Sequence, residues 1–173
     1  MKEVSWKDLN LNPMTAIGSD WFALAAGNEK DGCNAMTVAW GHLGAIWDRE
    51  SNPDCLPTAV VYVRPSRYTK EFMDREALFT LSLFDRSGRA ALGYIGSHSG
   101  RDEDKLAIAG LKPVYADGTA YREGARLVLI CRKLYTAPLK EEGFVDRALV
   151  DYNYPKRDFH QFYVGEIIKV LTE

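Results

Sequence analysis

The feature of this sequence that most constrains its fold is a series of short apolar and β-branched segments that do not alternate regularly with helical ones. Strands are predicted at residues 34–40, 58–63, 78–84, 125–134 and 162–171,. Helices are predicted only in the middle of the chain, at residues 69–75, 89–95 and 102–109,. Regular alternation would indicate a doubly wound parallel sheet. This pattern instead favours a mainly β fold, an antiparallel barrel with peripheral helices.

Glycine and proline mark the breaks between these segments. An apolar stretch at residues 14–26 ends in a predicted turn at 27–32, which begins and ends with glycine,. Residues 48–57 contain Asn52, Pro53 and Pro57 and are predicted to form a loop,. The 173 residues, of which 46% are hydrophobic, suffice for one domain over residues 1–173 with a buried core,.

Charge and composition exclude several classes of function. The net charge is −2, and Lys and Arg form no basic arm or stripe, so we expect no nucleic-acid partner,. The N-terminus lacks a secretory apolar region and no apolar run could span a bilayer, which predicts a soluble, cytoplasmic protein without membrane contact,. The three cysteines and three histidines show no metal-ligand spacing, so no metal is expected,.

A first candidate anion site follows residue 98. Ser99-Gly100-Arg101-Asp102 has the S-x-x-D spacing of a capping box and would open the helix at 102–109,. Helix N-termini attract anions, and Arg101 and Lys105, four residues apart, would share one helix face,. The alternative is a well-capped surface helix whose basic residues face water, and the spacing alone does not decide between the two.

A second cluster lies where a predicted strand meets a predicted helix. Guanidinium and hydroxyl groups, which commonly bind phosphate, are concentrated there in Arg64, Ser66, Arg67, Tyr68 and Thr69,. Ser66 or Thr69 could instead simply cap the helix,. Two such clusters in one acidic chain favour an anion site. The G-x-G-x-x-G and G-K-[ST] fingerprints are missing, and a glycine-flanked segment resembling a nucleophile elbow has His98 at its centre, which disfavours a hydrolase,.

The segment at residues 34–40 alternates small residues with larger apolar ones. Such a strand could be approached closely by a flat heteroaromatic ring, and the Asn34 and Thr37 side chains could address the polar atoms of that ring. On the pattern alone, an ordinary core strand is the better interpretation.

Four segments, in order, resemble the signature segments of the flavin reductase-like proteins, in particular the flavoredoxin-like subgroup. They are residues Asn34–Trp40, Arg64–Thr69, Ser99–Lys105 and Asp158–Glu166, and the resemblance extends from about Met14 to Val170. It implies the FMN-binding split-barrel fold, an antiparallel Greek-key barrel, in a homodimer whose flavin sites lie beside the subunit interface.

The resemblance also implies roles for individual residues. The strand residues that would lie along the isoalloxazine ring are Asn34, Ala35, Met36, Thr37, Val38, Ala39 and Trp40. The residues that would hold the ribityl phosphate are Arg64, Ser66, Arg67, Tyr68, Thr69, Ser99, Gly100, Arg101 and Lys105. His160 matches a histidine near the flavin and the nicotinamide and is the candidate catalytic residue. Here Phe159 separates Asp158 from His160, whereas many relatives have adjacent Asp and His, so this chain departs from the paired arrangement. The alternative for His160 is a partly buried strand histidine.

Three hypotheses for the function follow. The first is an NAD(P)H:flavin oxidoreductase that passes a hydride from NADH or NADPH to FMN and then reduces a free flavin, a metal complex or a protein. The second is a non-enzymatic electron carrier of the flavoredoxin type that docks on a redox partner protein. The third is an interaction module without flavin, in which the four tryptophans are core or interface residues; this hypothesis leaves both phosphate clusters unexplained.

Overall fold

All strand pairs are antiparallel in the part of the chain described by this computed structural model, residues 1–50 and 54–173. Eight strands form one sheet in the order β3-β2-β6-β9-β10-β5-β4, with β1 paired to β10, and β7 and β8 form a separate hairpin. The strands are β1 (Lys2–Val4), β2 (Phe22–Asn28), β3 (Gly32–Val38), β4 (Gly41–Ala45), β5 (Pro57–Val63), β6 (Leu78–Leu83), β7 (Pro113–Ala116), β8 (Thr119–Arg122), β9 (Leu127–Pro138) and β10 (Gln161–Thr172). The predicted mainly β antiparallel architecture is confirmed.

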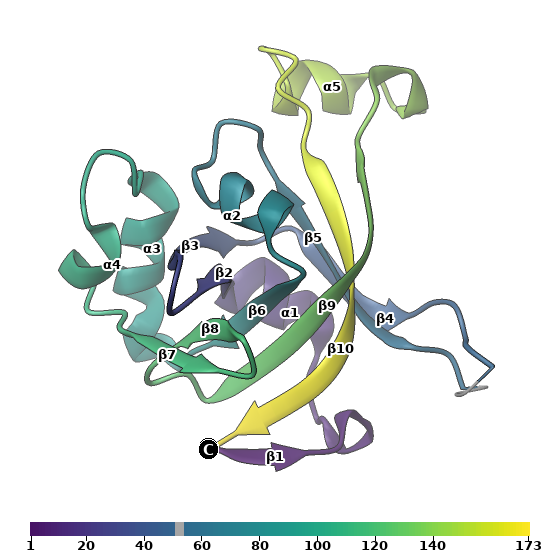
Figure 1. Cartoon of the computed structure of the whole chain (residues 1–173). Coiled ribbons are helices and arrows are strands. Elements are labelled where there is room, and N and C mark those ends of the chain that lie inside the picture. Colours follow the sequence, from purple (N-terminus) through teal and green to yellow (C-terminus); the bar gives the residue numbers. More distant parts are fainter. Residues whose placement is uncertain (51–53) are drawn as a thin grey trace.

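The sheet curls into a barrel that stays open on one side (Figure 1). Its two end strands, β3 and β4, are joined by Ala39 and Trp40, yet in the described residues they do not pair with each other. β4 pairs instead with β5, through Gly41 opposite Val61. β3 therefore approaches β5 across an unpaired gap, where a few of their residues come into contact. This gap is the position of the site described below.

Two apolar cores stabilise the sheet, one on each side of β2. Phe22 and Leu24 pack into the barrel interior, whereas Ala23 and Ala25 pack outward against Leu92 and other residues near α3. Because both faces of β2 are buried, the strand reads as a continuous apolar run rather than as an alternating one. The apolar segment at 14–26 is therefore visible in the sequence, but its pattern does not indicate a strand.

The helices cover the barrel at its margins. They are α1 (Pro13–Thr15), continued by a π-helix (Ala16–Asp20), then α2 (Thr69–Arg75), α3 (Arg89–Ser97), α4 (Lys105–Ile108) and α5 (Ala148–Asn153). The prediction of a helix at 69–75 is confirmed, and α3 extends the helix predicted at 89–95 by two residues.

The helix predicted at 102–109 is wrong at its N-terminus, because α4 begins only at Lys105. Asp104 caps it, and its carboxylate accepts a hydrogen bond of 3.1 Å from the Ala107 amide. Ser99 is not a cap: its hydroxyl accepts from the Arg101 amide at 3.2 Å within a turn that precedes the helix. Two possible caps lie five residues apart in the chain, and the later one forms the helix.

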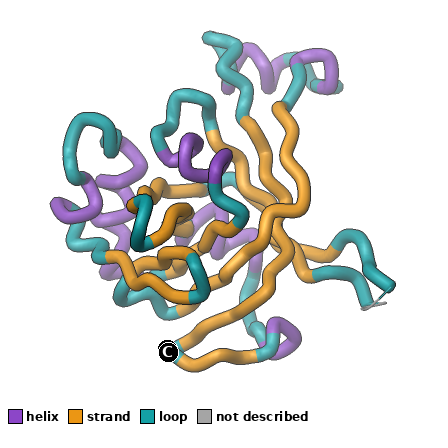
Figure 2. The backbone as a smooth tube through the Cα atoms, viewed as in Figure 1, coloured by secondary structure: helices purple, strands orange, loops and turns teal. Residues whose placement is uncertain are grey.

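β9 and β10 are the longest strands and run side by side from the helix at the top of the view towards the C-terminus (Figure 2). β10 extends the strand predicted at 162–171 by one residue at each end, whereas β9 begins two residues later and ends four residues later than the strand predicted at 125–134. The connection between them carries α5, which stands apart from the rest (Figure 1). The register shifts between Val164 and Gly165. A Cβ atom at Gly165 would lie 2.5 Å from the Phe79 ring, so this β-bulge needs glycine,.

Two other boundaries differ from the prediction. The strand predicted at 34–40 spans Gly32–Val38, because Ala39 and Trp40 form the link to β4. The loop predicted at 48–57 falls partly on residues 51–53, which lie outside the described residues, and Pro57 already begins β5. Among the described residues, no helix has the length and apolar character needed to cross a bilayer.

Candidate functional site

A cavity of about 180 Å³ lies in the gap between β3 and β5. We call it the aromatic cavity. Its wall contains five consecutive residues from β3 and the link, together with two from β5 and its C-terminal end and two from later segments. They are Met36, Thr37, Val38, Ala39 and Trp40, then Tyr62 and Arg64, then Arg67 and His160. Five residues predicted to lie along a flat ring are thus brought together.

A second, smaller cavity of about 100 Å³ adjoins the first through Met36 and Arg67, which line both. We call it the basic cavity. Its other lining residues are mostly polar and come from the segment before α2, from the end of α3 and from α4: Ser66, Tyr68, Thr69, Ser97, His98, Ser99 and Lys105. The two sequence clusters predicted to bind phosphate therefore meet in one cavity, where Arg67 and Lys105 lie together.

Lys105 is the most unusual residue of the basic cavity, because its side chain is charged and only 3% exposed. Its ammonium group donates hydrogen bonds to the carbonyl oxygens of Ile95 (2.8 Å) and His98 (3.0 Å). Burial, and then the nearby Arg67 guanidinium, lower the pKa of Lys105 to about 8,. The charged form of Lys105 is therefore held at a free-energy cost that a bound anion would reduce.

Arg67 adds a second positive charge to this cavity. Its guanidinium donates to the Gly96 carbonyl at 2.8 Å, which leaves further N–H groups available,. Within the described part of the chain neither Arg67 nor Lys105 forms an ion pair. The charge of Glu103 raises the pKa of Lys105 from a distance. The Glu103 carboxylate itself accepts a hydrogen bond from the Tyr94 hydroxyl at 2.9 Å. Both cations also contact the last carbonyls of α3, a stabilising arrangement in itself, yet the cavity keeps an excess of positive charge.

The hydroxyl groups of the basic cavity come from Ser66, Thr69, Ser97 and Ser99. Asn34 positions one of them, since its amide donates to the Thr69 hydroxyl at 2.9 Å. Asn34 itself lines neither cavity, so the structure places it behind the site. Gly100 packs against it, and a Cβ atom there would lie 2.7 Å from the Asn34 amide oxygen. Asn34 and Gly100 thus shape the site from outside.

Arg101 does not line the basic cavity. Its guanidinium donates to Glu71 at 2.5 Å and to the Ser66 carbonyl at 3.1 Å, and the side chain is 42% exposed. The expectation that Arg101 and Lys105 share a helix face is wrong, because α4 begins at Lys105. Arg101 lies instead over the Tyr68 ring, in a groove that shares Tyr68 and Lys105 with the basic cavity.

Arg64 lines the aromatic cavity but not the basic one, contrary to the phosphate role expected for it. Its guanidinium donates to the Asp158 carboxylate at 2.7 Å and to the Asn153 carbonyl at 2.9 Å. The hydrogen bond from Arg64 lowers the pKa of Asp158 below its ordinary value. The charge of Arg64 is therefore already balanced within the protein.

His160 lines the aromatic cavity and is buried, at 7% exposure. Its Nδ1 atom is 2.8 Å from the Tyr154 hydroxyl, and its ring centroid lies 4.9 Å from that of Trp40. Burial, followed by the charge of Arg64, lowers the pKa of His160 to about 4. The imidazole is therefore neutral at pH 7, and Asp158 pairs with Arg64 rather than with His160.

The side chains of β3 point alternately to the two sides of the sheet, which separates their roles. Met36 and Val38 face the barrel interior, whereas Ala35 is buried in the outer core and lines neither cavity. The Thr37 hydroxyl donates to the Leu92 carbonyl, so this group is used within the protein. Ala35 and Thr37 therefore lie on the face opposite to Met36 and Val38, and of these two Ala35 lines neither cavity.

Two aromatic residues of the site were not predicted from the sequence. Tyr62 lines the aromatic cavity, and Tyr154 orients His160. A tyrosine at the last but one position of a β-branched strand could have indicated Tyr62. Nothing in the spacing indicates Tyr154, which lies just after α5.

The aromatic cavity opens onto a larger, mostly apolar groove of about 540 Å³, with which it shares Ala39, Trp40 and Tyr62. The far wall of the groove comes from the connection between β9 and β10, through Leu139, Phe144, Leu149, Asn153 and Tyr154. A flat molecule could therefore reach the aromatic cavity from the groove.

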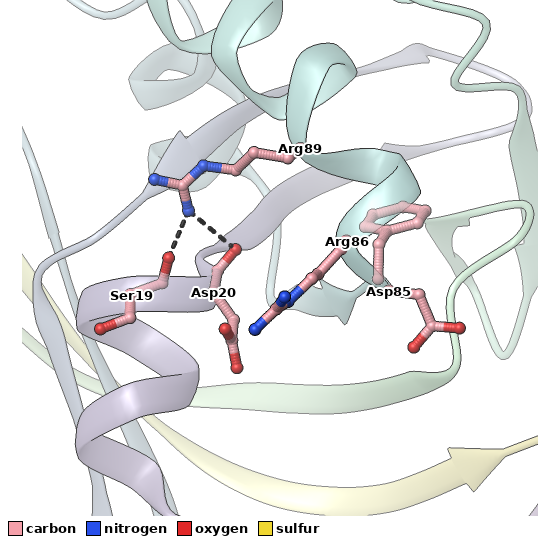
Figure 3. Close-up of a pocket in the computed structure, with 6 residues that line it drawn as sticks. Ser19, Asp20, Asp85, Arg86 and Arg89 are labelled. Atoms are coloured by element: carbon pink, nitrogen blue, oxygen red, sulfur yellow. Dashed lines mark hydrogen bonds between the residues drawn. The ribbon is translucent and has the colours of Figure 1, made fainter.

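A further pocket of about 290 Å³ lies away from the site and shares no residue with either cavity (Figure 3). There the Arg89 guanidinium donates to the carbonyl oxygens of Ser19 and Asp20 and covers the Trp21 ring. Arg89 thus fastens the start of α3 to the end of the π-helix, which is a structural role.

Comparison with known proteins agrees with this description. The model of the flavin reductase like domain matches residues 50–173. Flavoredoxin of Desulfovibrio vulgaris is 20% identical, with a TM-score of 0.64 over 100% of this chain and 77% of that one. Flavoredoxin of Methanosarcina acetivorans is 22% identical, with a TM-score of 0.64 over 100% and 76% of the two chains.

An NADH:FAD oxidoreductase of Streptomyces globisporus is 15% identical, with a TM-score of 0.62 over 89% of this chain and 75% of that one. A search among curated proteins found no match. The structural neighbours confirm the fold, and the family model covers well over half of the sequence. The chain belongs to the flavin reductase-like family.

Proposed function

We propose that the chain binds FMN, with the tricyclic ring in the aromatic cavity and the phosphate in the basic cavity. The observation that carries this proposal is the adjacency of the two cavities, one lined by aromatic and apolar groups and the other by two cations without a carboxylate partner among the described residues. A phosphate dianion would supply the missing negative charge. The hydroxyls of Ser66, Thr69 and Ser99 would complete its hydrogen bonds.

FMN, when bound, would supply the hydride chemistry, and the residues of this chain would supply orientation and charge balance. Arg67 and Lys105 would hold the phosphate end. The Arg64–Asp158 ion pair would fix the wall of the aromatic cavity without adding net charge. Neutral His160 would offer a hydrogen-bonding edge. The resemblance implies a catalytic role for this residue, and here we propose a positioning role for it.

We further propose an NAD(P)H:flavin oxidoreductase in which the donor reaches the aromatic cavity through the apolar groove. The groove is wide, shares Trp40 and Tyr62 with the aromatic cavity, and suits a planar nicotinamide. The electrons would then leave to an acceptor that enters by the same route once the nicotinamide has left.

The second candidate is an electron carrier that docks on a redox protein. Large apolar side chains exposed around the groove favour it, namely Met14 (79%), Trp40 (45%) and Leu149 (49%),. The same surface supports a homodimer with the site beside the subunit interface, which sedimentation of the purified protein would test.

Anaerobic reduction separates the candidates. The FMN-loaded protein is mixed with NADH or NADPH in the absence of oxygen, and the visible flavin absorbance is followed. Prompt bleaching is expected for the oxidoreductase. A protein that stays oxidised with both nucleotides but bleaches with dithionite is the electron carrier, and failure to take up FMN would overturn both candidates.

A further inference from the structure

A cysteine, a tyrosine and an arginine meet outside the two cavities. Cys33 lies at the start of β3, Tyr115 in β7 and Arg122 at the end of β8. The Cys33 sulfur is 3.2 Å from Arg122 Nη2 and 3.5 Å from the Tyr115 hydroxyl oxygen. We call these three residues the thiol cluster. Cys33 also lines the groove of about 510 Å³ that contains Arg101, so its sulfur can be reached from solvent.

Arg122 is the unusual member of this cluster, because its side chain is fully buried at 0% exposure. Nη1 donates weakly to the Leu111 carbonyl at 3.4 Å, and Nη2 points to the Cys33 sulfur. Among the described residues, the buried Nε has no hydrogen-bond partner and no carboxylate forms an ion pair with this guanidinium. A buried guanidinium stays charged and requires an anion beside it.

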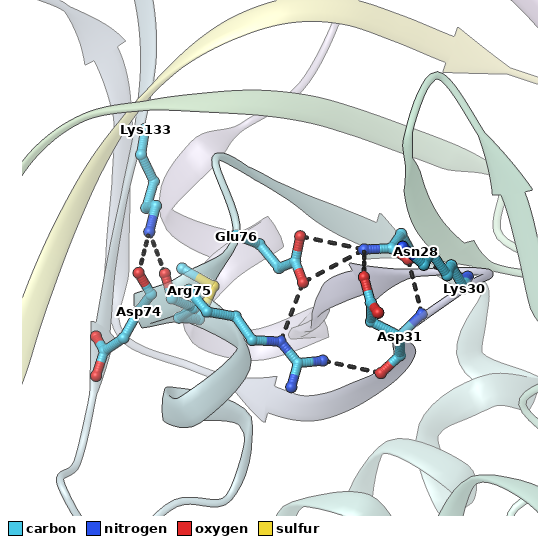
Figure 4. Close-up of polar contacts among 8 residues, drawn as sticks. Asn28, Lys30, Asp31, Asp74, Arg75, Glu76 and Lys133 are labelled. Atoms are coloured by element: carbon cyan, nitrogen blue, oxygen red, sulfur yellow. Dashed lines mark hydrogen bonds and ion pairs between the residues drawn. The ribbon is translucent and has the colours of Figure 1, made fainter.

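Of the four carboxylates that line the groove, three are directed at other groups. Asp31 accepts a hydrogen bond of 3.2 Å from the Asn28 amide, as Figure 4 shows. Glu103 accepts from Tyr94 at 2.9 Å, and Asp104 caps α4. Asp102 lines the groove as well, without an ion pair to Arg122. The sulfur of Cys33 is thus the group that faces the buried positive charge.

Tyr115 supports the same assignment. Its hydrogen bond with Cys33, and then burial, raise the pKa of Tyr115 above its ordinary value, while Glu29 acts in the same direction and Arg122 in the opposite one. The phenol therefore keeps its proton and can donate it in a hydrogen bond to the sulfur. A buried guanidinium and a phenol that both donate to one sulfur atom stabilise a thiolate.

We propose that the contacts of Arg122 and Tyr115 with its sulfur make Cys33 the site at which hydroperoxides oxidise this protein. The sulfur attacks one oxygen of hydrogen peroxide, the O–O bond breaks, and hydroxide leaves and takes up a proton to become water. The sulfur loses two electrons and becomes a sulfenic acid, and the peroxide gains them.

The other two cysteines provide internal controls. Cys55 is exposed, and Cys131 is fully buried at 0%. Burial raises the pKa of Cys131 well above its ordinary value, so this thiol stays protonated. If exposure alone governed the reaction, Cys55 would react first; the proposal predicts that the less exposed Cys33 does.

The test uses the whole chain without added flavin, so that its outcome is independent of the proposed function. Limiting hydrogen peroxide is added with dimedone at about pH 6, well below the ordinary thiol pKa of about 8.5, and mass spectrometry follows each cysteine. Cys33 is expected to be trapped at least about tenfold faster than Cys55. An equal or faster reaction at Cys55 overturns the proposal.

Variants of Arg122 and Cys33 test whether Arg122 causes the faster trapping of Cys33. Arg122→Met should abolish the advantage of Cys33 over Cys55, whereas Arg122→Lys, which keeps the charge, should retain most of it. Cys33→Ser confirms which peptide carries the label and should leave the trapping of Cys55 unchanged. Should the Arg122 variants fail to fold, the wild-type comparison of Cys33 with Cys55 still decides the proposal.

Discussion

At the aromatic cavity the Arg64 guanidinium lies 2.7 Å from the Asp158 carboxylate, whereas at the basic cavity Arg67 and Lys105 donate to backbone carbonyl oxygens. The two regions adjoin each other, and both contain cations close to buried apolar groups. In the first, the protein balances the charge itself. In the second, no described carboxylate forms an ion pair with the cations, so the charge is left for a ligand.

This difference separates residues that hold the protein together from residues that would hold the cofactor. A cation already paired within the fold gains little by binding a phosphate, because it must share or lose its partner. A buried cation without a carboxylate partner gains much more free energy by binding a phosphate. Mutations of the charged residues at the aromatic cavity should therefore change mainly the stability of the fold. Mutations of the cations at the basic cavity should change mainly the affinity for FMN.

The largest expected effect concerns acid stability at the aromatic cavity. The pKa of His160 is about 4 in the folded chain and about 6.5 when unfolded, so the unfolded state takes up a proton first as the pH falls,. The free energy of unfolding should be fully retained above pH 6.5 and should drop by roughly 3 kcal/mol between pH 6.5 and 4.

Urea unfolding at several pH values measures this loss. His160→Asn should lose less stability than the wild type over the same interval, whereas His42→Asn, at an exposed imidazole, should behave like the wild type. The explanation fails if the His160 variant and the wild type fall equally.

The next effect concerns the ion pair at the same cavity. Arg64→Met should reduce the free energy of unfolding by about 1–3 kcal/mol, because it leaves the Asp158 carboxylate half-buried and without its donor,. Asp158→Asn combined with Arg64→Met should cost less than the sum of the two single changes. Strict additivity in this double-mutant cycle would show that the pair does not stabilise the fold.

A smaller effect is expected for the pH dependence of FMN binding at the basic cavity. The phosphate is a dianion above about pH 7, and Lys105, with a pKa of about 8, binds it in the charged form. Affinity should therefore fall above pH 8, by up to about tenfold per pH unit. Lys105→Arg should remove the dependence, since arginine stays charged. Fluorescence titration of FMN at several pH values provides the measurement, and a flat wild-type profile would contradict it.

The sequence allowed much of the fold to be predicted where local pattern and final packing agree. β5 is a β-branched run and α2 begins with a hydroxyl residue, and both lie where they were expected. β4 was missed because Gly41–Ala45 contains no β-branched residue, and its strand conformation comes from pairing with β5. Short strands that depend on a neighbour leave little local signal.

The residues that make up the candidate site were largely predictable from the sequence. Which of its cations have a carboxylate partner within the protein was not. Arg64 and Arg67 are three residues apart and look equivalent in the sequence, yet the partner of Arg64 is 94 residues away. Arg101 was expected to join Lys105, but the cap at Asp104 shortened the helix and left Arg101 with Glu71. Which cation is balanced internally depends on such distant contacts, and spacing does not reveal them.

The most direct test of this account compares the affinity of FMN with that of riboflavin, which lacks the phosphate. Lys105→Gln should weaken FMN by about 1–3 kcal/mol while riboflavin affinity stays nearly constant. Arg67→Gln, at a residue that lines both cavities, should weaken FMN more than it weakens riboflavin. Arg101→Gln, whose guanidinium is already paired with Glu71, should change neither by more than about 0.5 kcal/mol,. An unchanged preference for FMN in both the Arg67 and the Lys105 variants would show that the phosphate does not lie in the basic cavity.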